Sequence, residues 1–253
     1  LIDHMQHDGL TCPFENWGMG CAAEWTANEF SISRDDQDAL AAQSHIRASK
    51  ATSQDWYKEE IIPLEASQIK QRAGVIIDEG VRGDSTTESL GKLRPAFAKE
   101  GTVTAGNASQ ISDGGAAVVV MSKESAQETN TEVLATIIDY NTYGVEPKKI
   151  FTAPGLGIAQ LLERNNLTIN DIDVFEINEA FAVQVLQNTQ HLGLDQSKVN
   201  LGGGGVAIGH PIGASGTRVL VSLIHHLKRT GGKRGIVSLC LGGGNAVSML
   251  IEA

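Results

Sequence analysis

The most regular pattern of apolar and polar positions lies in the C-terminal third of the chain. Apolar residues recur there at spacings of three and four, which predicts an amphipathic helix. These residues are Val219, Leu220, Leu223, Ile224 and Leu227. Similar patterns predict helices over residues 154–166 and 33–53, and Ser33 to Asp36 has the form of a capping box at the start of the second.

Shorter apolar runs predict the strands. Residues 173–177 alternate between apolar and polar, while residues 235–239 and 246–251 flank a glycine turn, as in a β-hairpin. Residues 132–140 also have the pattern of a strand. From residue 132 onward the predicted order is strand, helix, strand, helix, helix, strand, strand, which is one α/β layer unit.

The N-terminal half has a weaker pattern. Residues 1–30 are predicted to be loop-like, residues 61–64 to be a short edge strand, and residues 66–100 to be polar and irregular. Residues 116–121 are continuously apolar, which predicts a buried strand. The regular core is therefore expected mainly in the second half of the chain.

Three polar residues stand at strand ends or beside glycine-rich turns. Asn178 follows the strand over 173–177, and Cys240 precedes a triple glycine in the hairpin. His210 lies within residues 202–216, where the density of glycine implies positive-φ turns or close approach to a ligand. Loops at strand ends carry the chemistry in α/β folds. Taken singly, these residues are also typical of a helix cap, a structural histidine and a core cysteine.

Composition limits the class of protein. The chain has 253 residues, of which 41% are hydrophobic and 20% charged, as in a soluble globular protein with one large or two modest domains. The net charge of −10 argues against a nucleic-acid surface, although basic residues scattered over 66–100 favour a local anion-binding surface. No apolar run approaches the roughly 18 residues of a membrane span, and we expect no secretory signal.

The three cysteines are Cys12, Cys21 and Cys240, and their spacing matches no disulfide framework. Free thiols favour a reducing compartment, so a cytoplasmic protein is expected. Cys12 and Cys21, taken with His4 and His7, match no common zinc spacing. We therefore expect no metal site.

Three motifs, in this order and spacing, resemble the thiolase family. They are Asn178-Glu179-Ala180-Phe181-Ala182, Gly209-His210-Pro211-Ile212-Gly213-Ala214-Ser215-Gly216 and Cys240-x-Gly242-Gly243-Gly244. The similarity extends upstream through residues 92–97 and 101–109 and so covers essentially the whole chain. It implies an α/β fold of layered αβαβα architecture. In that fold, residues 1–112 form the loop domain that binds coenzyme A, residues 113–131 end the N-terminal core half, and residues 132–253 form the complete C-terminal core half.

The resemblance also implies an activity, which is acyl transfer in fatty acid metabolism. The expected reaction is the Claisen condensation of two acetyl-CoA to acetoacetyl-CoA, or the reverse thiolysis of a 3-ketoacyl-CoA, as in an acetyl-CoA C-acetyltransferase or C-acyltransferase. Such chemistry needs an acid/base, an activated nucleophile and donors for oxyanions. A tuned thiol can titrate near neutral pH, so Cys240 is expected to act as acid and base. By resemblance, Cys240 exchanges the α-proton, and His210 activates a nucleophilic cysteine and donates to an oxyanion. Asn178 holds a water in the same oxyanion hole, and the Gly242 N–H donates in a second hole.

Further residues match positions that contact coenzyme A in the family, and they fall into three pairs. Arg82 and Ser89 match the nucleotide contacts, Ala105 and Ser109 the pantetheine contacts, and Met19 and Phe181 the lining of the acyl pocket. Coenzyme A thioesters are then substrates, and no tightly bound cofactor is expected. The resemblance implies a homodimer or homotetramer, with neither a nucleic acid nor a membrane as partner.

One family feature is absent from this sequence, namely the segment that carries the nucleophilic cysteine. Cys12 and Cys21 lie in the stretch that matches the loop domain, and neither is expected to be the nucleophile. The first half of the fold is therefore expected to precede Leu1.

Two alternatives stay open. A ketoacyl-ACP synthase would carry a second histidine where this chain has Cys240, so the cysteine favours a thiolase. A non-catalytic or fragmentary thiolase-like protein that binds coenzyme A or lipid fits the missing nucleophile.

Overall fold

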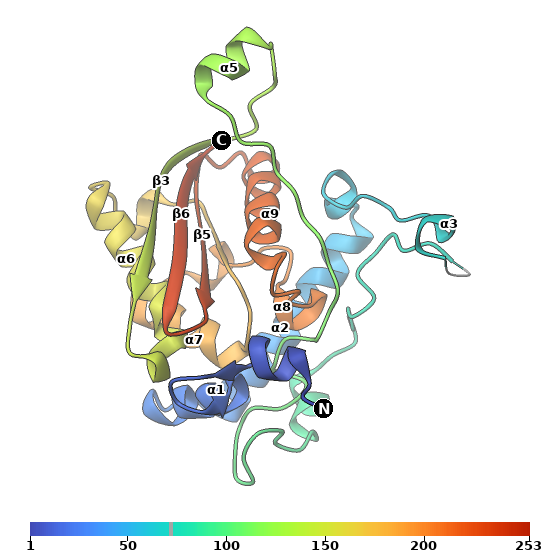
Figure 1. The fold of residues 1–253 in the computed structure, drawn as a ribbon, viewed down its shortest axis with the longest axis vertical. Coiled ribbons are helices and arrows are strands. Elements are labelled where there is room, and N and C mark those ends of the chain that lie inside the picture. The colour runs from blue at the N-terminus through green and yellow to red at the C-terminus, as the bar shows by residue number, and fades with distance from the viewer. Residues whose placement is uncertain (71–72) are drawn as a thin grey trace.

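The computed structural model describes residues 1–70 and 73–253, and Figure 1 shows its fold. The helices are α1 Met19–Glu29, α2 Arg34–Ser53, α3 Ala66–Ile69, α4 Thr87–Gly91, α5 Lys123–Glu128, α6 Ala153–Arg164, α7 Ala182–Leu192, α8 Gly205–Ile208 and α9 Ser215–Thr230. The strands are β1 Thr11–Cys12, β2 Trp17–Gly18, β3 Thr136–Gly144, β4 Val174–Ile177, β5 Arg234–Leu241 and β6 Asn245–Glu252. A π-helical turn spans Met5–Gly9, and 3-10 turns span Trp56–Glu59, Pro147–Thr152, Ile169–Asp171 and Gln196–Lys198.

The main sheet has four strands in the order β3-β6-β5-β4. Strand β4 runs parallel to β5, with Ile177 beside Ser238, whereas β5 and β6 form the predicted antiparallel hairpin. Strand β3 pairs with β6 in antiparallel orientation. The α/β class and the predicted order of the main elements after residue 132 are confirmed, although β3 begins and ends four residues later than expected.

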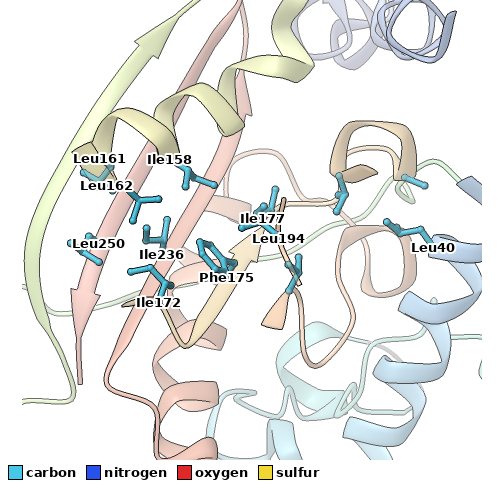
Figure 2. Close-up of a cluster of buried hydrophobic side chains, with 13 residues drawn as sticks. Leu40, Ile158, Leu161, Leu162, Ile172, Phe175, Ile177, Leu194, Ile236 and Leu250 are labelled. Carbon is cyan, nitrogen blue, oxygen red and sulfur yellow. The ribbon is translucent and has the colours of Figure 1, made fainter. Parts of the chain in front are cut away.

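Helices cover both faces of this sheet. On one face, Phe175 and Ile236 pack with α6 residues such as Ile158, and Figure 2 shows this cluster. On the other face, Val174 packs against Leu223 of α9. All four residues of β4 are consequently buried, so the predicted polar–apolar alternation does not become an alternation of exposure. The polar residue of that alternation, Glu176, is therefore enclosed within the protein.

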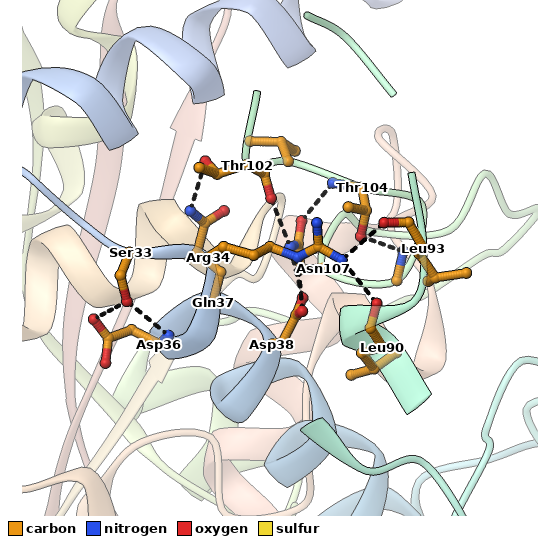
Figure 3. A network of polar contacts seen from close by, with 12 residues as sticks. Ser33, Arg34, Asp36, Gln37, Asp38, Leu90, Leu93, Thr102, Thr104 and Asn107 are labelled. Carbon is orange, nitrogen blue, oxygen red and sulfur yellow. Dashed lines mark hydrogen bonds and ion pairs between the residues drawn. The ribbon is translucent and has the colours of Figure 1, made fainter. Parts of the chain in front are cut away.

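A polar network fixes the middle of the chain against α2 (Figure 3). Asp38 on α2 accepts hydrogen bonds from Arg34, at 2.7 Å, and from the Asn107 side chain, at 2.9 Å. The Asn107 carbonyl in turn accepts from the Ala182 N–H at 2.8 Å. The segment around Asn107 is thereby held at the start of α7. The predicted start of α2 is confirmed, because the Ser33 side chain accepts a bond from the Asp36 N–H.

The first thirty residues were predicted to be loop-like, and this prediction is wrong. They contain a π-helical turn, the small β1–β2 hairpin and the eleven-residue helix α1. The buried face of α1 is formed largely by alanines, with Ala22, Ala23 and Ala27 packed near Phe151 and Val183. Small residues of this kind create no stripe of large apolar side chains, so the helical period is hard to see in the sequence.

Two predicted strands do not form among the described residues. Residues 116–121 are extended without a partner strand, and Val119 is 85% exposed, so the predicted burial is wrong. Within the described ranges, residues 61–64 make a single bridge, between Leu64 and Val75. In both places the apolar pattern is present, but no described neighbouring strand offers a ladder of hydrogen bonds.

Candidate active site

The site forms where β4 and β5 end side by side. The Asn178 N–H donates to the Ser238 carbonyl at 2.9 Å, which extends the parallel pairing by one residue beyond β4. Cys240 stands two residues further along β5, opposite Ala246 of β6. Because β4 and β5 are parallel, their carboxyl ends meet at one edge of the sheet. Asn178 and Cys240 therefore lie near the same edge.

His210 reaches Asn178 from the loop between α8 and α9. Gly209 has φ +96°, a conformation that favours glycine, and an added Cβ there would lie 2.1 Å from the Ser112 hydroxyl. The His210 N–H then donates to the Gln110 carbonyl at 3.2 Å. The Asn178 Nδ2 lies 3.3 Å from the His210 Nε2. Sequence reasoning thus placed two residues together that are distant in the chain.

The hydrogen bonds of the imidazole define its tautomer. Ser215 donates its hydroxyl hydrogen to the Pro211 carbonyl at 2.9 Å, so its oxygen accepts from His210 Nδ1 at 2.5 Å. With Nδ1 protonated, Nε2 of the neutral ring accepts from the Asn178 amide. Burial, followed by the charge of Arg218, lowers the pKa of His210 to about 4. The ring is therefore neutral at physiological pH, with the Nε2 lone pair directed at the Asn178 amide.

Cys240 has a different electrostatic environment from the one we expected. A thiol that titrates near neutral pH was predicted, but burial raises the pKa of Cys240 to about 12. The side chain packs against an apolar cluster that includes Met19 and Phe181. At neutral pH the residue is therefore a thiol, the form that donates a proton, and the prediction of a near-neutral pKa is wrong.

Gly242 is exposed in the turn that joins β5 to β6, and its carbonyl accepts from the Asn245 side chain at 3.3 Å. The next two glycines have positive φ values, and an added Cβ at Gly244 would lie 2.6 Å from the Val145 carbonyl. Glycine is thus required for the turn itself. The role of the Gly242 N–H as an oxyanion donor stays a prediction.

The predicted acyl and pantetheine contacts lie close to these residues. Met19, at the start of α1, and Phe181, just before α7, belong to the cluster that Cys240 contacts. The Ser109 N–H donates to the Ala180 carbonyl at 3.0 Å, which places this segment beside Phe181. Ala105 is exposed on the same segment. Four of the six predicted contacts therefore lie on elements adjoining the strand ends, and their binding roles stay predictions.

Arg82 and Ser89 lie on a separate part of the surface. Both are exposed, and the Arg82 N–H donates to His45 Nδ1 of α2 at 3.1 Å. Ser89 belongs to α4, where its hydroxyl accepts from the Thr86 N–H in a capping box. Neither side chain belongs to the apolar cluster around Cys240. The predicted contact of Arg82 and Ser89 with a nucleotide stays a prediction.

Glu179 supports the glycine loop that leads to His210. Its buried carboxylate accepts from Ser44 at 2.6 Å, from Asn200 at 2.9 Å and from the Val206 N–H at 3.2 Å. These partners come from α2, from the segment between the Gln196–Lys198 turn and α8, and from α8 itself. One carboxylate thus joins three elements behind the site. Buried charges with several donors of this kind fix a loop in one conformation.

Sequence analysis missed Arg218 and Glu176. Arg218 of α9 donates from Nη2 to the Asn178 Oδ1 at 3.4 Å, and its Nη1 lies 3.9 Å from a Glu176 carboxylate oxygen. The Glu176 side chain is 1% exposed and lies 3.5 Å from His226 Nε2. A glutamate inside a strand with apolar neighbours is a signal that could have revealed this buried group.

The buried carboxyl gives a first prediction, about stability and pH. Burial raises the pKa of Glu176 from 4.5 to about 8, against the opposing effect of Arg218. The folded state therefore keeps a proton that the unfolded state releases, so this stabilisation is complete below pH 4.5 and is lost as pH rises through 8. His210 and His226 have lowered pKa values, and above their ordinary value of 6.5 they are neutral in both states. We expect the free energy of unfolding to fall between pH 6.5 and 8.

Denaturant unfolding of the Glu176→Gln variant at several pH values tests this expectation. The variant should show a flatter dependence on pH than the wild type over that window. Glu163→Gln, on the exposed side of α6, is the matched control and should keep the wild-type slope. Equal slopes for wild type and Glu176→Gln would contradict the protonated state of Glu176.

The rest of the described chain adds two observations. No group of three or more metal-ligating side chains is found among the described residues. No helix within the described ranges has the length and apolar character needed to cross a bilayer.

Two family models match consecutive parts of the chain. The thiolase N-terminal domain matches residues 1–124, and the thiolase C-terminal domain matches residues 131–253. Together they account for nearly the whole sequence.

Individual relatives agree with this match. The acetyl-CoA acetyltransferase of Shinella zoogloeoides and a probable acetyl-CoA acyltransferase of Staphylococcus aureus strain COL are each 45% identical over 253 residues. Each alignment covers 100% of this chain and 64% of the relative, so the chain spans about 64% of the length of these curated relatives.

Solved structures share the fold. The acetyl-CoA acetyltransferase of Bacillus anthracis has a TM-score of 0.91 at 44% identity, over 96% of this chain and 62% of that one. Human mitochondrial 3-ketoacyl-CoA thiolase in complex with CoA has a TM-score of 0.89 at 35% identity, over 97% and 61%. With both family models matched, the fold shared and the three motifs placed around one sheet edge, this chain belongs to the thiolase family.

Proposed function

We propose that this chain carries the proton-transfer and oxyanion half of a thiolase-type acyltransferase. The substrates are coenzyme A thioesters, and the reaction joins two acetyl-CoA into acetoacetyl-CoA or cleaves a 3-ketoacyl-CoA with CoA. The observation that carries the proposal is the Asn178–His210 contact of 3.3 Å at the strand end beside the one that bears Cys240. The names of the relatives support the class of reaction.

The protonation states suit the proposed steps. The Cys240 thiol, with its pKa raised to about 12, is poised to protonate the acetyl-CoA enolate that leaves during thiolysis. In the condensation direction the same sulfur, as thiolate, removes the α-proton. The Nε2 lone pair of His210 accepts the proton of an attacking thiol once the thiol replaces the Asn178 amide as its hydrogen-bond partner. The resulting Nε2–H, together with the Asn178 amide, then faces a developing oxyanion.

The apolar cluster around Phe181 forms the acyl-binding end of the proposed substrate site. Met19 and Phe181 contact it together with Cys240, and Phe181 makes edge-on contacts with the rings of Phe97 and Phe151. An acyl chain placed there lies beside the thiol. In this proposal Ala105 and Ser109 border the pantetheine arm, and the exposed Arg82 and Ser89 meet the nucleotide end. A basic side chain on an acidic protein offers local attraction to phosphates.

The test is exchange of the acetyl-CoA methyl protons with solvent, because this step needs the acid/base but no acyl-enzyme. The chain is incubated with acetyl-CoA in D₂O, and deuterium at C2 is followed by mass spectrometry. We expect exchange well above a heat-denatured blank. The double variant Cys12→Ser/Cys21→Ser should exchange at the wild-type rate, and the intact mass of the protein should show no acetyl group on either cysteine.

The second candidate is a non-catalytic coenzyme A-binding relative. It would use the apolar cluster around Met19 and Phe181 to bind the thioester, without proton transfer. Saturable binding of acetyl-CoA without exchange of its methyl protons would overturn the catalytic proposal and favour this one. A homodimer or homotetramer is proposed for the assembly, and sedimentation would measure it.

A further inference from the structure

We propose that Arg218 is a positioning residue that selects the tautomer of His210 by fixing the orientation of the Asn178 carboxamide. The relevant contacts run from α9 through the end of β4 to the glycine loop. The tautomer itself is a property of this chain alone. Its catalytic consequence rests on the proposed function.

The argument begins with the two ends of the Asn178 amide. Its oxygen accepts from Arg218 Nη2 at 3.4 Å, and its nitrogen lies 3.3 Å from His210 Nε2. A guanidinium group has only donors, so the amide end that faces Arg218 must be the oxygen. The NH₂ end is then forced toward the imidazole, where it needs an acceptor. Nε2 must therefore carry the lone pair.

The opposite orientation shows what Arg218 excludes. A flipped amide would direct its NH₂ group at the guanidinium, placing donors of the two groups against each other. Its oxygen would then face Nε2 and favour a proton there. That change would leave Nδ1 without a hydrogen to donate to Ser215, whose own hydrogen is held by the Pro211 carbonyl. Leaving a buried polar atom without its partner is costly enough to decide between two tautomers.

Arg218 lies beside buried groups that the proposed reaction does not use. Its side chain is 19% exposed, and its Nη1 lies 3.9 Å from Glu176, which is almost fully buried beneath α9. Further titratable groups around this pair are Glu60, Asp78 and His226. Arg218 therefore reaches Asn178 from a buried polar cluster on the far side of the amide from His210. Its positive charge also helps to lower the pKa of His210.

The selected tautomer is the one that proton abstraction requires. A lone pair at Nε2 accepts a proton from a thiol, whereas an Nε2–H tautomer cannot do so without first losing its own proton. Loss of Arg218 would leave the amide free to flip, and His210 would populate both tautomers. Loss of Arg218 should therefore lower the rate of the chemical steps and leave the affinity for the thioester largely unchanged.

The direct test is ¹⁵N NMR of the histidine side chains in the wild-type chain. The seven histidines are separated by comparison with a His210→Gln spectrum, in which the His210 signals disappear. We expect His210 to show a protonated Nδ1 and an unprotonated Nε2 near pH 7. A wild-type His210 with its proton mainly on Nε2 would overturn the proposal without the need for any further variant.

Three variants then test the role of Arg218. Arg218→Met keeps the apolar stem and removes the donors, so His210 should become a mixture of tautomers. Arg218→Lys restores a cation that only donates and should recover most of the wild-type spectrum. Arg164→Met, which breaks an exposed ion pair with Asp139, is the matched control and should leave the His210 signals unchanged. An Arg218→Met spectrum identical to that of the wild type would also overturn the proposal.

Exchange of the acetyl-CoA methyl protons provides a kinetic test of the role of Arg218. We expect Arg218→Met to lower the maximal exchange rate about tenfold or more, with little change in the half-saturating acetyl-CoA concentration. Recovery in Arg218→Lys distinguishes positioning from a general loss of structure. If the wild type shows no exchange at all, the proposed function fails, whereas the NMR result still decides the role of Arg218.

Discussion

Replacing Cys240 by serine is expected to slow the exchange of the acetyl-CoA methyl protons by about 10²–10⁴-fold, the usual contribution of a positioned acid/base. The hydroxyl of serine is a far weaker acid than a thiol, so it neither donates nor returns the proton at a useful rate. The substitution is nearly isosteric, and Cys240 lies at the end of β5 against an apolar cluster. Binding of acetyl-CoA, measured by calorimetry, should therefore change little.

The pH profile of the wild type provides a second signature of the same residue. Because burial raises the pKa of Cys240 to about 12, only a small fraction is thiolate at neutral pH. The exchange rate should then rise about tenfold for each pH unit between pH 7 and 9, and the serine variant should lose this rise. Cys21→Ser is the matched control and should keep both the rate and the slope. Undiminished exchange in Cys240→Ser would remove this sulfur from the mechanism.

Replacing Phe175 by alanine is expected to lower the free energy of unfolding by about 3–5 kcal/mol, as for other buried aromatic residues. Phe175 is 0% exposed at the centre of β4, pairs with Ile236 of β5 and forms a bridge with Val199. A loss of this size is a large share of the about 5–15 kcal/mol that stabilises a typical domain. Chemical denaturation followed by circular dichroism measures it.

Phe14→Ala is the matched control, because that ring is 71% exposed. Its effect should stay within about 0.5 kcal/mol, as for other surface substitutions. A loss below 1 kcal/mol in Phe175→Ala would mean that the cluster of Figure 2 is not the main core. Because Asn178 follows β4 directly, a loosened strand should also reduce proton exchange.

The elements after residue 132 could be predicted from sequence because their cores use large apolar side chains at regular spacings. Leu223 and Leu227 show the helical period of α9, and the glycine-rich turn indicates the hairpin of β5 and β6. Helix α1 was not predicted, because its buried residues are mostly small and include three alanines. Residues 116–121 have the composition of a core strand, yet the described structure leaves them exposed, since composition does not supply a pairing partner.

The positions of the candidate site residues could be predicted from the sequence, but their electrostatics could not. Asn178, His210 and Cys240 could be located because each stands beside a strand end or a glycine-rich turn. The contact of Arg218 with Asn178 spans 40 residues of sequence, and no local pattern indicates it. The direction of the Cys240 pKa was mistaken because burial depends on how the surrounding elements pack. The roles of Gly242 and of the coenzyme A contacts stay predictions.

The exposed run over residues 116–121 also bears on how this chain behaves at high concentration. Val118, Val119, Val120 and Met121 are all exposed there, in an extended segment without a described partner strand. An apolar, uncharged segment of about six residues with free backbone groups is a template for intermolecular β-pairing and aggregation. Handling of the isolated chain is therefore expected to be limited by self-association along this segment, and a charged residue at Val119 would act as a gatekeeper against it.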